Sequence, residues 1–113
     1  MSNPSMFMSA TTLIGDNIRN AQDESLGELK EIMLNTTSGE IAYAVVSYGG
    51  ILGLGDKLFA VPWKAFTIDH ENHKLVLNVS KERLKDAPGF DKDRWPNFAD
   101  PSFVSSVGAY YAR

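Results

Sequence analysis

The hydrophobic and polar positions divide the first 79 residues into short runs that are typical of β-strands. The central run is residues 41–48 (IAYAVVSY), whose apolar or small side chains occupy both faces. We therefore expect a strand in the middle of a sheet, covered on both sides. A loop with four glycines follows, and residues 57–63 (KLFAVPW) predict the next strand. Pro62 marks an end, an edge or a bulge of that strand, because proline cannot donate a ladder hydrogen bond.

The segments before the central strand are less clearly patterned. Residues 1–11 predict a flexible tail, and residues 12–20 predict a short strand with Leu13 and Ile14, followed by a bend. Residues 26–35 (LGELKEIMLN) suit a helical face and a strand equally well. We favour a strand, because the turn-forming TTSG sequence behind it would join it to the central strand as a hairpin.

Two further runs complete the strand-rich part of the chain. Residues 64–69 (KAFTID) follow the proline, and residues 74–79 (KLVLNV) return after a polar turn with the alternation of a half-buried hairpin partner. Short strands joined by tight turns are typical of a small antiparallel barrel or sandwich. We therefore expect an all-β or mainly β fold, with an antiparallel β-barrel over residues 12–79.

After residue 79 the pattern changes from strand-like to helical. Ser80 is placed to cap a short helix with the sequence KERLKDA, and a Pro-Gly pair stops that helix. Asp100 and Pro101 suit the cap and first turn of a last helix, along which apolar residues form one stripe. The stripe consists of Phe103, Val104, Val107, Tyr110 and Tyr111. We expect residues 80–113 to be a helical and irregular extension packed on the barrel.

Composition and charge narrow the class of protein. The chain has 113 residues, of which 43% are hydrophobic and 22% charged, as in one globular domain. It has no cysteine, which excludes disulfides and thiolate metal sites and leads us to expect a cytoplasmic location. The net charge is −3 without a basic cluster, so we expect no nucleic-acid partner. No apolar run is long enough for a spanning helix, so we expect no membrane insertion.

Several spaced motifs resemble the PRC-barrel family, in particular its stand-alone bacterial members. They lie at residues 41–45 (IAYAV), 49–55 (GGILGLG), 60–63 (AVPW), 13–15 (LIG), 26–27 (LG), 87–90 (APGF) and 95–96 (WP). The resemblance covers residues 11–111 and implies a small, predominantly β barrel. One such barrel is the cytoplasmic domain of the photosynthetic reaction-centre H subunit. Another is the C-terminal domain of RimM-type ribosome maturation factors, where it serves protein binding. We expect neither a membrane anchor nor an additional N-terminal barrel in this chain, so neither function transfers.

The glycine loop resembles a phosphate-binding loop only in part. Gly50 and Gly55 have the required spacing, but Asp56 and Lys57 follow in place of Lys and Ser or Thr. No convincing helix follows that would offer its N-terminus to an anion. We interpret the loop as a tight connection between strands, and we expect no cofactor.

Titratable residues do not form a recognisable catalytic or metal site. His70 and His73 lie in one predicted turn, and the sequence offers no evident third ligand, so we interpret the turn as solvated. Asp91 and Asp93 alternate with basic residues, which is typical of a solvated surface. Whether the chain is an enzyme stays open, and a non-catalytic role is favoured.

Surplus large apolar residues predict an interaction surface. Aromatic residues crowd the C-terminal extension, and the plainer interpretation is that they lock it onto the barrel. The sharper interpretation is that some of them join the glycine loop in a surface for a protein partner or a second copy, as in a homodimer. The candidate residues of this surface are Ile51, Leu52, Leu54, Trp95, Phe103, Tyr110 and Tyr111.

These observations favour a non-catalytic protein–protein interaction or scaffold module. The alternative is small-ligand binding, or a minor enzymatic role, at a pocket between the glycine loop and the aromatic extension. RNA or ribosome association is disfavoured by the acidic balance of charge.

Overall fold

Strands dominate the computed structural model, which describes residues 7–48, 57–69, 71–72 and 74–112. The strands are β1 (Asn17–Arg19), β2 (Ser25–Leu34), β3 (Ile41–Tyr48), β4 (Lys57–Pro62), β5 (Phe66–Asp69), β6 (Lys74–Leu77) and β7 (Phe90–Asp91). The helices are α1 (Ala10–Leu13), α2 (Lys81–Lys85) and α3 (Pro101–Tyr111), with a 3₁₀ turn, η3, at Trp63–Ala65. The expected mainly β fold with a C-terminal helix is confirmed.

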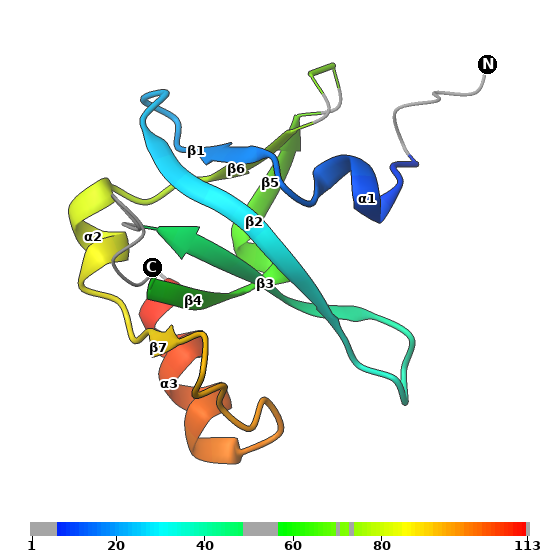
Figure 1. Cartoon of the computed structure of the whole chain (residues 1–113), viewed down its shortest axis with the longest axis vertical. Coiled ribbons are helices and arrows are strands. Elements are labelled where there is room, and N and C mark those ends of the chain that lie inside the picture. The colour runs from blue at the N-terminus through cyan, green and yellow to red at the C-terminus, as the bar shows by residue number, and fades with distance from the viewer. Residues whose placement is uncertain (1–6, 49–56, 70, 73, 113) are drawn as a thin grey trace.

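Within the described residues the strands form one sheet in the order β5-β6-β1-β2-β3-β4-β7. Neighbouring strands are antiparallel except β1 and β6, which run parallel. The sheet is strongly curved but not closed, and β5 and β7 are its edges (Figure 1). A closed barrel would need its two edge strands to pair with each other. Here β7 pairs only with β4, and the 3₁₀ turn η3 separates β4 from the other edge strand, β5.

The predicted strand at residues 12–20 is wrong in its first half. Leu13 ends the single helical turn α1, in which the N–H of Ile14 donates to the carbonyl of Ala10 at 3.0 Å. The helical turn buries Leu13 and leaves Ile14 39% exposed. Two adjacent apolar residues are too few to distinguish a helical period from a strand period, and β1 begins only at Asn17.

The ambiguous segment at residues 26–35 is a strand, as predicted. It is β2, which pairs with β3 from Glu28 to Leu34. Gly27 has a φ of +108°, and a Cβ at this position would lie 2.1 Å from the carbonyl oxygen of Ser47. Because only glycine allows so close an approach of two strands, this residue fixes how β2 crosses β3.

The central strand β3 is covered on both faces, as predicted. Ala44 and Val46 pack in the main core, which the curved sheet surrounds. Tyr43 points to the other face, where it packs with Ala60 of β4 and Val107 of α3. This burial on both faces explains why the strand shows no polar alternation.

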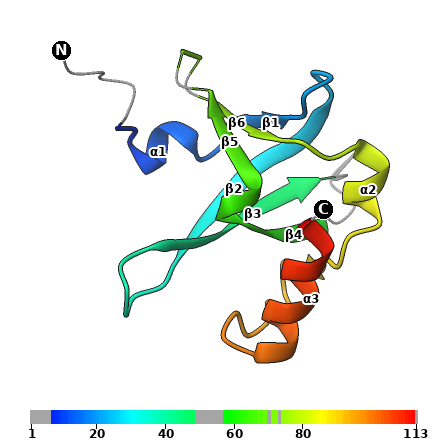
Figure 2. The same ribbon diagram turned by 180° about the vertical axis from the view of Figure 1, so that it is seen from behind.

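The capping residues of α2 and α3 lie where the sequence predicts them. The hydroxyl of Ser80 accepts from the N–H of Arg83 at 3.0 Å, and Asp100 Oδ1 accepts from the N–H of Ser102 at 2.9 Å. Hydrogen bonds from the hydroxyl and the N–H of Ser102 lower the pKa of Asp100. The helix that begins here, α3, runs beside β4 (Figure 2).

Candidate functional site

The residues of the predicted interaction surface come from the glycine loop and from both ends of α3. Outside the described residues lie its glycine-loop members, Ile51, Leu52 and Leu54. Trp95 and Phe103 lie near the N-terminal end of α3, whereas Tyr110 and Tyr111 lie at its C-terminal end. About 10 Å of helix axis separates the two aromatic groups. Phe103 and Tyr111 nevertheless pack against the same buried cluster, which includes Val107 between them in the helix.

The first group belongs to an aromatic cluster that joins β3 to the chain before α3. The cluster consists of Tyr43, Phe90, Trp95, Phe98 and Phe103. The ring centroid of Phe98 lies 5.5 Å from that of Tyr43 and 5.4 Å from that of Phe103, in the tilted and edge-on geometries that aromatic rings prefer. Burial raises the pKa of Tyr43. Trp95 is 42% exposed, so the cluster reaches the surface.

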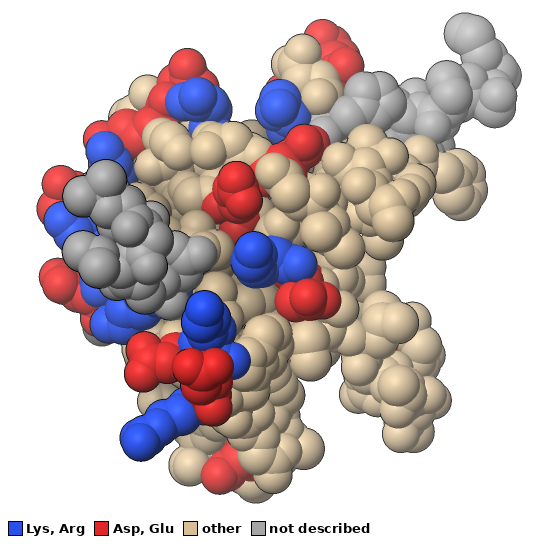
Figure 3. All heavy atoms as spheres, viewed as in Figure 1, with Lys and Arg blue, Asp and Glu red and all other residues tan. Residues whose placement is uncertain are grey.

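An apolar hollow of about 240 Å³ lies beside this cluster, and we call it the hairpin groove. Its lining consists of Met33, Leu34, Asn35, Ala42, Tyr43, Phe98 and Ala99, and none of these residues is charged. Leu34 is 58% exposed. The distal half of the β2–β3 hairpin carries few charged side chains, whereas acidic and basic side chains gather on the side of α2 (Figure 3).

The hairpin groove exists because β2 and β3 extend beyond their neighbours. β1 pairs with β2 only over residues 25–28, and β4 begins to pair with β3 at Tyr43. Among the described residues, the outer edge of β2 at residues 31–34 therefore has no strand partner. The chain around Phe98 and Ala99 then covers one face of this two-stranded ribbon in part and leaves the hollow.

Sequence reasoning did not select the residues that line the groove. The sequence pattern predicts Met33, Leu34 and Tyr43 only as ordinary members of two paired strands. A difference in strand length is the signal that points to them, because a strand of ten residues beside one of three must leave one end uncovered. The sequence hides this difference, because it predicts a strand over residues 12–20 that is longer than β1.

The second aromatic group connects α3 to α2. The guanidinium of Arg83 lies 4.2 Å from the ring centroid of Tyr110 and donates a hydrogen bond to the carbonyl of Tyr110. In return, the Tyr110 hydroxyl donates to the carbonyl of Arg83 at 2.5 Å. Tyr111 packs against both core clusters, and burial raises the pKa of its hydroxyl. These contacts suit the plainer interpretation of this group, a lock that holds the extension in place.

The other motifs considered in the sequence are two histidines, the glycine loop and two aspartates. His70 and His73 lie outside the described residues, and so do the glycines of residues 49–55. The predicted ligand pocket between the glycine loop and the aromatic extension therefore lies partly outside the described residues as well. Asp91 and Asp93 are both exposed. The described residues contain no group of three or more metal-ligating side chains, and none of their helices is long and apolar enough to cross a membrane.

Comparison with known proteins identifies one family. A family model for the PRC-barrel domain matches residues 6–84, which extend from before α1 to within α2. No curated protein matches the sequence.

Proposed function

The chain belongs to the PRC-barrel domain family, and on that premise we propose that it is a non-catalytic protein-interaction module. Its binding surface is the hairpin groove, together with the exposed part of Trp95. The observation that carries this proposal is an uncharged hollow bordered by a leucine that is 58% exposed. Exposed apolar surface that is gathered in one place, rather than scattered, is typical of an interface.

The geometry of the groove favours a second copy of the chain as the partner. In a two-fold dimer the same patch must supply both the projecting and the receiving groups. Leu34 projects from the end of β2 and also borders a hollow that is large enough for a leucine side chain. The patch is therefore suited to bind itself. We place this homodimer in the cytoplasm, because the chain has no cysteine.

Each exposed apolar group adds a modest stabilisation. Covering the exposed parts of Leu34 and Trp95 contributes roughly 1–2 kcal/mol apiece, on the scale of about 25 cal/mol per Å² of apolar surface. An association that rests on a few such groups is weak and depends on protein concentration, since binding must also offset the loss of free motion.

The test is the molar mass in solution as a function of concentration, measured by size-exclusion chromatography with light scattering. We expect the wild type to approach the dimer mass as concentration rises. We expect Leu34→Glu to remain a monomer, because a carboxylate would have to be desolvated in the interface. At dilutions where the wild type is also a monomer, the two proteins should have the same melting temperature.

Ile14→Glu is the matched control. Ile14 is also an exposed apolar residue, at 39%, but it is not part of the groove. The Ile14→Glu variant should therefore form dimers at the same concentrations as the wild type. A wild type that is a strict monomer at high concentration, or a Leu34→Glu variant that keeps the dimer mass, would refute self-association through this surface.

A further inference from the structure

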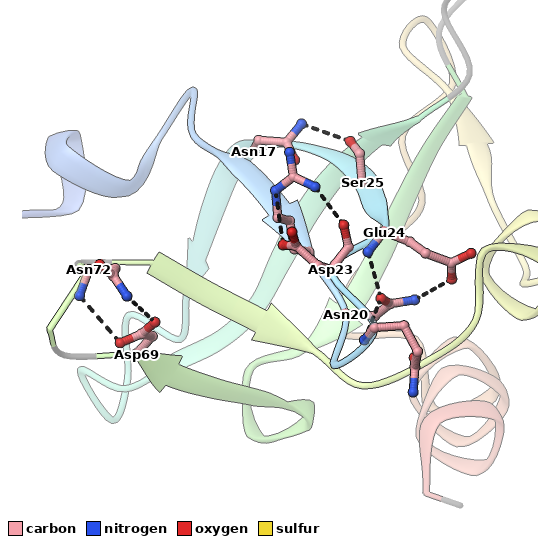
Figure 4. Close-up of polar contacts among 9 residues, drawn as sticks. Asn17, Asn20, Asp23, Glu24, Ser25, Asp69 and Asn72 are labelled. Carbon is pink, nitrogen blue, oxygen red and sulfur yellow. Dashed lines mark hydrogen bonds and ion pairs between the residues drawn. The ribbon is translucent and has the colours of Figure 1, made fainter.

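β1 covers the first half of the outer edge of β2, and side-chain hydrogen bonds fix it there. The side-chain nitrogen of Asn17 donates to the Ser25 hydroxyl at 2.8 Å (Figure 4). In the turn after β1, Asn20 is only 4% exposed, and its side-chain nitrogen donates to the carbonyl of Val79 at 2.9 Å. Its side-chain oxygen accepts from the N–H of Glu24 at 2.9 Å. β1 is therefore a fixed neighbour of β2, and its end marks where the open part of the edge begins.

Beyond β1 the occupied part of this edge ends at Leu29. The N–H of Leu29 donates to the carbonyl of Asp16 at 3.0 Å, and its carbonyl accepts from the N–H of Gly15 at 2.8 Å. Among the residues that the structure describes, positions 31–34 form no further backbone pair on this side. Proteins usually protect such an open edge, for instance with charged side chains or proline. Positions 32–34 carry neither, so this edge is suited to pair with another strand.

The open backbone groups belong to Ile32 and Leu34. The N–H of Asn35 donates to the carbonyl of Glu40 across the hairpin at 2.8 Å, so it points toward β3. Alternate residues of an antiparallel strand direct their N–H and C=O groups to the same side. The register shift between positions 33 and 34 arises from an extra residue in β3, so β2 itself keeps this alternation. The N–H and C=O groups of Leu34 and Ile32 therefore point away from β3.

We propose that this open edge of β2 pairs with the same edge of a second copy, so that the two sheets become one sheet across a two-fold axis. The inference rests on the proposed homodimer and specifies how its two copies meet. A two-fold axis perpendicular to a sheet reverses the strand direction, so the two β2 strands run antiparallel. A strand of this kind can then exchange N–H···O bonds with its own copy.

The sequence of the edge favours one register of this pairing. Directly opposite residues share a face of the sheet, so the axis must pass between one residue and its own copy. With Met33 at the axis, Leu34 lies opposite the partner's Ile32, and both residues use their outward N–H and C=O groups. Glu31 then lies opposite the partner's Asn35, so no like charges meet.

The same register brings the two hairpin grooves together. Met33 lines the groove and packs on the second core cluster, whereas Ile32 packs on the main core, so the two side chains lie on opposite faces. With the two copies of Met33 at the axis, the grooves adjoin on one face. On the other face, Leu34, which is 58% exposed, packs on the partner's Ile32. A second copy therefore matches the edge in its backbone groups and its apolar side chains.

The test is amide hydrogen exchange of the ¹⁵N-labelled full chain, in a concentrated sample that light scattering shows to be about nine-tenths dimer and in a dilute monomeric sample. We expect the amides of Ile32 and Leu34 to exchange about tenfold more slowly in the concentrated sample, because they exchange through the remaining monomer. Leu29 is the internal control, since its N–H faces the same edge but donates to Asp16 in both states. Its exchange rate should change by less than about twofold.

A mixed dimer of ¹³C-labelled and unlabelled chains tests the register. Opposite residues that do not exchange hydrogen bonds have their Cα atoms closest across an antiparallel pair. We therefore expect an intermolecular nuclear Overhauser effect between the Cα hydrogens of the two copies of Met33. Its absence, with such an effect between another pair of β2 residues, would overturn the register.

One pair of variants isolates the backbone contribution. Leu34→Pro removes the outward N–H of position 34 and no ladder bond to β3. Leu34→Val is the matched control, because valine is close to proline in size and keeps the N–H. We expect the dissociation constant of the Leu34→Pro dimer to be at least about tenfold that of the Leu34→Val dimer, since both symmetric copies of the bond are lost.

The outcomes separate this inference from the proposed homodimer. A wild type that is a strict monomer at high concentration would overturn both and leave the edge to an extended segment of another protein. A dimer in which the amides of Ile32 and Leu34 exchange as fast as in the monomer would overturn the edge pairing alone. Equal dissociation constants of Leu34→Pro and Leu34→Val would do the same, because the groove contact does not need the N–H of position 34.

Discussion

Single residues decide how closely the strands can approach, and Gly27 is the clearest case. Replacing it with alanine would force a Cβ to within 2.1 Å of a carbonyl oxygen at a positive φ. We expect Gly27→Ala to lower the free energy of unfolding by roughly 2–4 kcal/mol, measured by urea denaturation, because the strand must move away from β3.

Gly108 provides the control for this substitution. It lies within α3, and a Cβ added there meets nothing within 4 Å. Gly108→Ala should leave stability unchanged or raise it by up to about 1 kcal/mol, because alanine favours the helix. Similar effects of the two substitutions would contradict this account of Gly27.

The neighbouring tyrosines of α3 should respond in opposite ways to loss of their hydroxyl groups. The Tyr110 hydroxyl donates to Arg83, so Tyr110→Phe should cost about 1 kcal/mol of unfolding free energy. The Tyr111 hydroxyl is buried without a partner among the described residues. Tyr111→Phe should therefore be neutral, or stabilising by up to about 1 kcal/mol. Equal destabilisation of both variants, in thermal or urea unfolding, would contradict the assigned roles.

The raised pKa of Tyr111 adds an alkaline signature to this comparison. Because the folded state keeps its phenolic proton to higher pH than the unfolded state, stability falls as pH rises past the unfolded value of about 10. Tyr111→Phe removes this contribution, so its stability should fall less steeply than that of the wild type above that pH.

At the scale of elements, the sequence predicts strands well where they are bounded by turns. β2, β3 and β6 were predicted within a few residues of their ends, and the capped helices α2 and α3 were found from Ser80 and Asp100. These signals are local, since capping and turn formation depend on neighbouring residues alone.

Elements whose form depends on distant contacts could not be predicted. α1 buries Leu13 and leaves the adjacent Ile14 exposed. Which of the two is buried depends on the surrounding core and not on the local sequence. The two-residue β7 exists because β4 offers it an edge. The same limit applies to the groove: its aromatic residues are visible in the sequence, but the uncovered end of β2 depends on the length of a strand elsewhere.

At the scale of the whole molecule, α3 closes the second face of the sheet. Val107 of this helix is 1% exposed and packs with Tyr43 and Ala60. A chain that ends at Ala99 would expose this apolar face to water. We expect it to lose cooperative thermal unfolding and to bind a hydrophobic dye, because several kcal/mol of apolar burial is lost.

A chain shortened only by residues 112–113 is the control, and it should unfold like the wild type, because α3 ends at Tyr111. If the chain that ends at Ala99 unfolds with the wild-type midpoint and does not bind the dye, α3 is dispensable for the fold and its contacts are superficial.

The single parallel junction of β1 with β6 has a consequence for the order of folding. β2, β3 and β4 follow one another along the chain and pair as neighbours, so their contacts close short loops. The bond from Asn20 to the carbonyl of Val79 instead joins positions 59 residues apart, and Arg19 meets Val76 over a similar separation. Closing so long a loop has a large entropic cost before any contact forms. The three-stranded meander should therefore form early, and the β5–β6 hairpin should dock on β1 late.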